Sequence, residues 1–164
     1  MPRQPTIDTP NSDQQWCPVC DATPVVLVAL RHLVMRRWTE ELLATEHGCW
    51  EVASMDGDEP LVDAIARTQP DLVVVDDSDF PSCCQSALHR VPPAQVVVVG
   101  PEPDTAYRSL ALVNGAGGWV CRDHVGEDLS SAMRGALGCR HGPCPPAGSP
   151  TPRTGHLEPT TTRS

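Results

Sequence analysis

PDLVVVDD, residues 70–77, places four consecutive apolar residues, Leu72 to Val75, directly before two aspartates. A short apolar run rich in β-branched residues is typical of a strand that is covered on both faces. Such strands occur in parallel sheets that are wrapped by helices. The first aspartate, Asp76, is therefore expected at the carboxyl edge of a sheet, where open α/β folds bind their ligands.

Similar apolar segments recur along the chain and alternate with helical patterns. Strands are predicted over residues 24–30, 50–54, 71–76, 94–100 and 118–122, and helices over residues 31–48, 56–69, 82–91, 104–116 and 125–138. Strands that alternate with helices indicate an α/β fold with a parallel sheet. We therefore expect a flavodoxin-like, doubly wound, five-stranded parallel sheet in the order 2-1-3-4-5.

Apolar residues at helical spacing predict which face of each helix is buried. In the first predicted helix, Val34, Trp38 and Leu42 recur every four residues and are expected to face the sheet. In the last predicted helix, Leu129 and Met133 are expected to do the same.

The two ends of the chain differ in composition from its middle. Residues 1–21 contain a C-x2-C motif and residues 139–164 are rich in proline and threonine; both segments are polar and are expected to be disordered. The remaining residues, 22–138, are expected to form one folded domain. The net charge of −9 disfavours nucleic-acid binding, and no segment has the pattern of a signal peptide or a membrane span, so a cytoplasmic protein is expected.

Four cysteines flank the predicted domain as two pairs, Cys17 with Cys20 and Cys139 with Cys144. The chain enters the first strand and leaves the last helix at the same, amino edge of a doubly wound sheet. The four thiolates are therefore candidate ligands of a structural zinc ion that joins the two ends of the domain. The alternative is that they are separate thiols in flexible flanks.

Two longer segments carry a resemblance to a known family. They are DGDEPLVDAIARTQPDLVVVDD, residues 56–77, and YRSLALVNGAGGWVCRDHVGEDLSSAMRGAL, residues 107–137. With them the chain resembles the receiver domains of two-component response regulators over nearly all of residues 24–138. The resemblance implies that Asp76 occupies the position that accepts a phosphoryl group from a histidine kinase.

Other positions depart from the family's pattern. The acids that hold Mg²⁺ after the first strand are matched by Ala29 and Leu30, or by Arg31 and His32 in a shifted register. The hydroxyl residue after the fourth strand is matched by Gly100, and the lysine after the fifth strand is matched by Arg122, which keeps the charge. The switch aromatic of the family is retained as Trp119. Because Mg²⁺ usually needs more than one carboxylate, Mg²⁺ binding and ordinary phosphorylation of Asp76 are not expected. Asp76 would instead be a solvated residue at the strand end, paired with Arg122.

The sequence thus favours a stand-alone, atypical receiver-like protein without enzyme activity, which regulates by binding a protein such as a kinase or a transcription regulator. The resemblance implies a homodimer through the fourth helix, fifth strand and fifth helix. Two alternatives remain: a phosphorelay receiver that uses Asp76, and a zinc- or thiol-dependent sensor.

Overall fold

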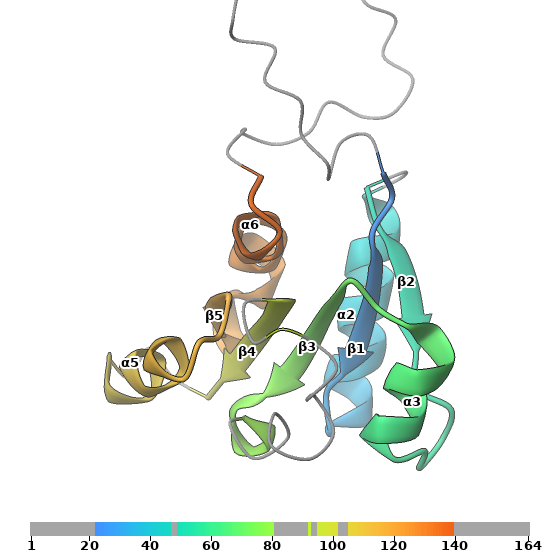
Figure 1. The fold of residues 1–164 in the computed structure, drawn as a ribbon, viewed down its shortest axis with the longest axis horizontal. Coiled ribbons are helices and arrows are strands. Elements are labelled where there is room, and N and C mark those ends of the chain that lie inside the picture. Colours follow the sequence, from blue (N-terminus) through green and yellow to red (C-terminus); the bar gives the residue numbers. More distant parts are fainter. Residues whose placement is uncertain (1–21, 47–48, 81–91, 93–94, 102–104, 140–164) are drawn as a thin grey trace, which may run out of the picture.

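A computed structural model describes residues 22–46, 49–80, 92, 95–101 and 105–139. Its strands are β1 (Val25–Ala29), β2 (Glu51–Ser54), β3 (Leu72–Asp76), β4 (Val96–Gly100) and β5 (Gly118–Cys121). All neighbouring strands pair in parallel, and the sheet has the order β2-β1-β3-β4-β5 (Figure 1). The predicted flavodoxin-like order 2-1-3-4-5 is confirmed.

The helices within the described residues are α2 (Leu33–Thr45), α3 (Leu61–Thr68), α5 (Thr105–Val113) and α6 (Val125–Ala136). Two 3-10 turns, η1 (Asp77–Asp79) and η3 (Arg122–His124), directly follow β3 and β5. The helix predicted over residues 82–91 lies outside the described residues. None of the helices in the described ranges is both long enough and apolar enough to cross a membrane.

The strands are buried on both faces because successive side chains point to opposite helix layers. In β3, Leu72 and Val74 pack into the cluster formed with α2 and α6, whereas Val73 and Val75 pack into the cluster formed with α3 and α5. Asp76 continues the alternation of Leu72 and Val74, so its side chain lies on the α2 and α6 side.

The buried face of α2 differs from the predicted one. Val34 is 71% exposed and Trp38 is 44% exposed, whereas Thr39 and Leu43 are fully buried. Leu42 is partly buried against the core, as predicted. The prediction was wrong for Val34 and Trp38, because two apolar stripes run side by side along this helix. A threonine interrupts the stripe that contacts the sheet, so the neighbouring stripe has the more regular apolar spacing. In α6, by contrast, Leu129 and Met133 are buried as predicted.

A carboxylate near the amino edge of the sheet connects three elements. Glu46, just after α2, accepts hydrogen bonds from Trp50 Nε1 at 2.9 Å, from Arg134 at 3.0 Å and from the hydroxyl of Ser130. The guanidinium of Arg134 also lies over the Trp50 ring, 5.8 Å from its centroid. The loop before β2 is thereby linked to both helices of one layer.

Candidate functional site

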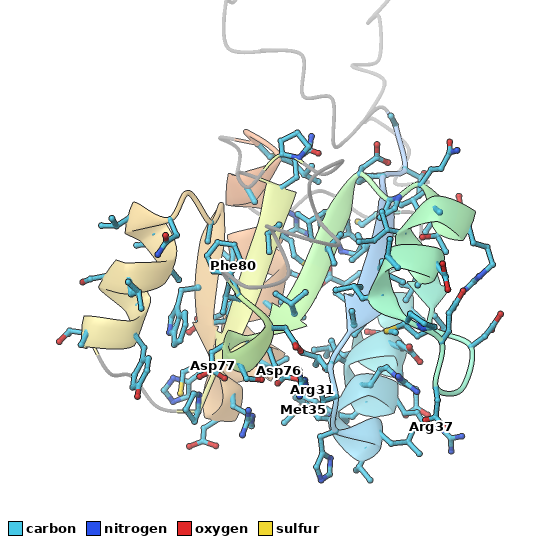
Figure 2. The ribbon with its side chains drawn as sticks, turned by 60° about the horizontal axis from the view of Figure 1, so that its bottom comes forward. Arg31, Met35, Arg37, Asp76, Asp77 and Phe80 are labelled. Atoms are coloured by element: carbon cyan, nitrogen blue, oxygen red, sulfur yellow. The ribbon has the colours of Figure 1, made fainter. Side chains whose placement is uncertain are left out.

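Asp76 lies at the carboxyl end of β3, in the centre of the sheet, and is 7% exposed. It contributes to a pocket of about 390 Å³ that is also lined by Arg31, His32, Met35, Ser78 and Arg122. Figure 2 shows Arg31 and Met35 beside Asp76, on the side of α2. The pocket lies between β1 and β3, where the strand order reverses, which is the usual ligand position of this fold class.

Both carboxylate oxygens of Asp76 have donors from the protein itself. The backbone N–H of Arg31 donates to Oδ2 at 2.6 Å, and the guanidinium of Arg122 lies 3.4 Å from Oδ1. Arg122 extends from η3, which directly follows β5, so its side chain reaches across the carboxyl edge of the sheet. The predicted pairing of Asp76 with Arg122 is present. The prediction that Asp76 is solvated was wrong, because Arg31 and Arg122 cover its carboxylate from the ends of β1 and β5.

A second ion pair, between Arg31 and Asp79, lies at the β1 side of the site. The Nε of Arg31 donates to both carboxylate oxygens of Asp79, at 2.9 and 2.8 Å, and its NH2 also contacts Oδ1. These hydrogen bonds and the charge of Asp79 raise the pKa of the Arg31 guanidinium. The pairing of Asp79 with Arg31 was not predicted from the sequence; only the predicted proximity of the two strand ends could have indicated it.

Ala29 and Leu30, at the positions where the family has its metal-binding acids, lie in different environments. Ala29 pairs with Val75 in the sheet and packs into the α3 and α5 cluster, away from Asp76. Leu30 is buried in the α2 and α6 cluster. The following residue, Arg31, is the one that reaches the Asp76 carboxylate.

The residues at this site do not fit a magnesium ion. Mg²⁺ requires oxygen ligands in near-octahedral geometry. Here the oxygens of Asp76 and Asp79 accept bonds from arginine donors, and Figure 2 shows Asp77 on the side of Asp76 away from Arg31. Among the described residues, no group of three or more acidic, histidine or cysteine side chains is arranged to hold a metal ion.

Gly100, a departure from the family's pattern, is in contact with Trp119, the retained aromatic. A Cβ atom placed on Gly100 would lie 1.8 Å from Trp119 Cζ2 and 2.1 Å from Cη2. The indole therefore occupies the space that any side chain at position 100 would need. Trp119 packs against the cluster formed with α3 and α5, so its indole lies on that side of the sheet.

Three of the four predicted zinc ligands, Cys17, Cys20 and Cys144, lie outside the described residues. Cys139 follows α6 and is buried in the cluster that also contains Trp50, near the start of β2. Figure 1 shows both ends of the described domain at the same edge of the sheet. The zinc site stays a prediction.

Solved structures with the same fold are response regulators and their receiver domains. A DNA-binding response regulator of the LuxR family from Staphylococcus aureus is 17% identical, with a TM-score of 0.55; the match covers 70% of this chain and 98% of that one. A response regulator receiver protein from Burkholderia phymatum is 20% identical, with a TM-score of 0.55 and coverages of 71% and 96%. A two-component response regulator of the LuxR family from Aurantimonas is 18% identical, with a TM-score of 0.57 and coverages of 76% and 91%.

The structural similarity establishes the fold, which is that of a receiver domain. No protein-family model matches the chain, and no curated protein sequence matches it significantly.

Proposed function

We propose that this receiver-fold chain is an atypical signalling protein that regulates by binding another protein, a kinase or a transcription regulator, and that it does so without phosphorylation of Asp76. The receiver fold supports the signalling role. The atypical mode rests on the residues around Asp76.

One observation carries the proposal: the Asp76 carboxylate is neutralised by arginine where a receiver would neutralise it with a metal. Phosphoryl transfer to a carboxylate needs a cation that bridges the incoming phosphoryl oxygens, usually Mg²⁺. Arg122 and the backbone N–H of Arg31 each donate to one Asp76 oxygen, and the buried side chain of Leu30 offers no metal ligand. In the proposed mechanism Asp76 is therefore paired with protein donors and binds no metal ion.

The contact between Gly100 and Trp119 supports a fixed conformation of the carboxyl edge of the sheet, where Asp76 also lies. A side chain at position 100 cannot coexist with the indole in its present place. The resemblance assigns position 100 to the hydroxyl that bonds the phosphoryl oxygen, and here it carries no hydroxyl. We propose that Trp119 holds the α5 side of the sheet in one state, which a partner binds without a phosphorylation signal.

Phosphorylation of Asp76 can be tested directly. Incubation with acetyl phosphate and Mg²⁺ is expected to leave the intact mass of the protein unchanged, while a conventional receiver domain treated in parallel gains one phosphoryl group. The reason is the missing metal site and the paired carboxylate. A mass gain that disappears in Asp76→Asn would refute the proposal and support the phosphorelay alternative.

The binding surface is proposed to include α5, whose outer face is apolar. Tyr107, Leu110 and Val113 follow one another at helical spacing and are 53%, 54% and 84% exposed. Contiguous exposed apolar side chains mark protein interaction sites. Together with β5 and α6 this face would form the homodimer that the resemblance implies.

We expect Leu110→Glu combined with Val113→Glu to weaken self-association by about tenfold or more, because each substitution places a charge in an apolar contact. Sedimentation velocity over a concentration series measures the association. Val62→Glu is the matched control, since Val62 is 44% exposed on α3, on the same side of the sheet but on another helix. Association that is absent in the parent protein, or unchanged in the double variant, would exclude α5 as the dimer surface.

A further inference from the structure

A second groove lies beside the Asp76 pocket, on the other side of Arg31. It has a volume of about 460 Å³ and runs between α2 and the loop that joins β2 to α3. Arg31, Arg36 and Arg37 line it from the β1 end and from α2. Figure 2 shows Arg37 on the side of α2 opposite to Met35, so Arg37 points away from the Asp76 pocket.

Two of the three arginines in this groove are unpaired within the described ranges. Arg36 and Arg37 make no ion pair with any described residue, although Glu40 and Asp58 line the same groove. The third, Arg31, is already paired with Asp79, so Arg36 and Arg37 are the groups left to bind an anion. Each guanidinium presents a planar set of N–H donors that fits phosphate and carboxylate oxygens.

The walls of the groove are held in place by hydrogen bonds. On the loop side, Arg67 donates to the carbonyl oxygen of Ser54 at 2.9 Å and to Glu59 at 2.7 Å. The hydrogen bonds from Arg67 lower the pKa of Glu59 to about 2. On the β1 side, Asp79 holds the Arg31 guanidinium. These bonds fix Ser54 and Arg31, which line the groove, before a ligand arrives.

The start of α2 adds positive potential near the arginines. This helix has thirteen residues, no side-chain cap at His32 and no acidic residue in its first turn. The unsatisfied N–H groups of a helix amino terminus favour an anion nearby. Arg31, which lines the groove, directly precedes this uncapped turn.

We propose that this groove binds a small phosphate-bearing molecule that also carries N–H or O–H donors, such as a nucleotide or a sugar phosphate. Arg36 and Arg37 would bind the phosphate oxygens, because guanidinium groups contact phosphate in bidentate fashion. The volume suits a ligand of this size. Glu40 and Asp58 would accept the donors, and Glu40 Oε1 has no hydrogen-bond partner within the described part of the chain. The inference goes beyond the proposed function, since Asp76 takes no part in it.

Calorimetric titration with ADP and with inorganic pyrophosphate, both without Mg²⁺, tests the groove. ADP is expected to bind with a Kd below about 1 mM and more tightly than pyrophosphate. Arg36→Gln combined with Arg37→Gln is expected to weaken ADP binding by about tenfold or more, because two charge-assisted contacts are lost. Arg108→Gln, the same change on exposed α5, is expected to leave the affinity unaltered. Circular dichroism confirms that the double variant is folded.

Failure of ADP to bind the parent protein, or equal ADP affinity of the Arg36 and Arg37 double variant, would overturn the site. Pyrophosphate binding as tight as that of ADP would overturn the assignment to a donor-bearing ligand. None of these results depends on acetyl phosphate labelling, so the groove and the proposed function can fail separately.

Discussion

Replacement of Gly100 with alanine is expected to destabilise the protein by roughly 2–3 kcal/mol, the upper range for overpacking a folded core. The new methyl group would lie 1.8 Å from Trp119 Cζ2, far inside van der Waals contact. The β4 backbone is fixed by its pairing with β3 and β5, so the indole must move. Urea denaturation measures the loss, and the tryptophan emission spectrum reports whether the indole has left its place.

A double-mutant cycle identifies the indole as the cause. In a Trp119→Ala background, Gly100→Ala is expected to cost less than about 0.5 kcal/mol, since the clash is gone and alanine is no less favourable than glycine in a strand. Gly118→Ala is the matched control: it is also a strand glycine, but its Cβ would meet its nearest neighbour, Ala132, at 3.3 Å. An equal loss in both backgrounds would mean that the backbone, and not Trp119, makes Gly100 necessary.

The strands and their order could be predicted because they depend on short-range features. Each strand is a β-branched apolar run, and burial on both faces in a parallel sheet needs little more than that. The inner face of α2 could not be predicted in the same way. Thr39 is fully buried there, and periodicity counts a threonine against burial.

The candidate site could be predicted only in part. Asp76 and Arg122 end up close together because both follow parallel strands, and the ends of such strands share one edge. The Arg31 pair with Asp79 depends on side-chain conformations that periodicity does not report. Gly100 and Trp119 were each singled out, but their contact depends on the direction of the indole.

Replacement of Glu46 with alanine is expected to destabilise the protein by about 2 kcal/mol, less than for a fully buried ion pair because Glu46 is part-buried. Arg134, whose side chain is 13% exposed, would lose its only carboxylate partner among the described residues, and Trp50 Nε1 would lose its acceptor. Arg134 Nε is already buried without a hydrogen-bond partner among the described residues. Chemical denaturation, with the slope checked for two-state behaviour, gives the change in the free energy of unfolding.

Most of this cost comes from the part-buried charge of Arg134, which is left unpaired. A second substitution separates that cause from lost packing. Arg134→Met removes the charge and keeps an apolar chain over Trp50, so in this background Glu46→Ala is expected to cost about 1 kcal/mol or less. Glu41→Ala, an exposed glutamate on the same helix, controls for the change in α2 and should lie within about 0.5 kcal/mol of the parent. A full loss in the Arg134→Met background would instead assign the stabilisation to the Trp50 and Ser130 hydrogen bonds.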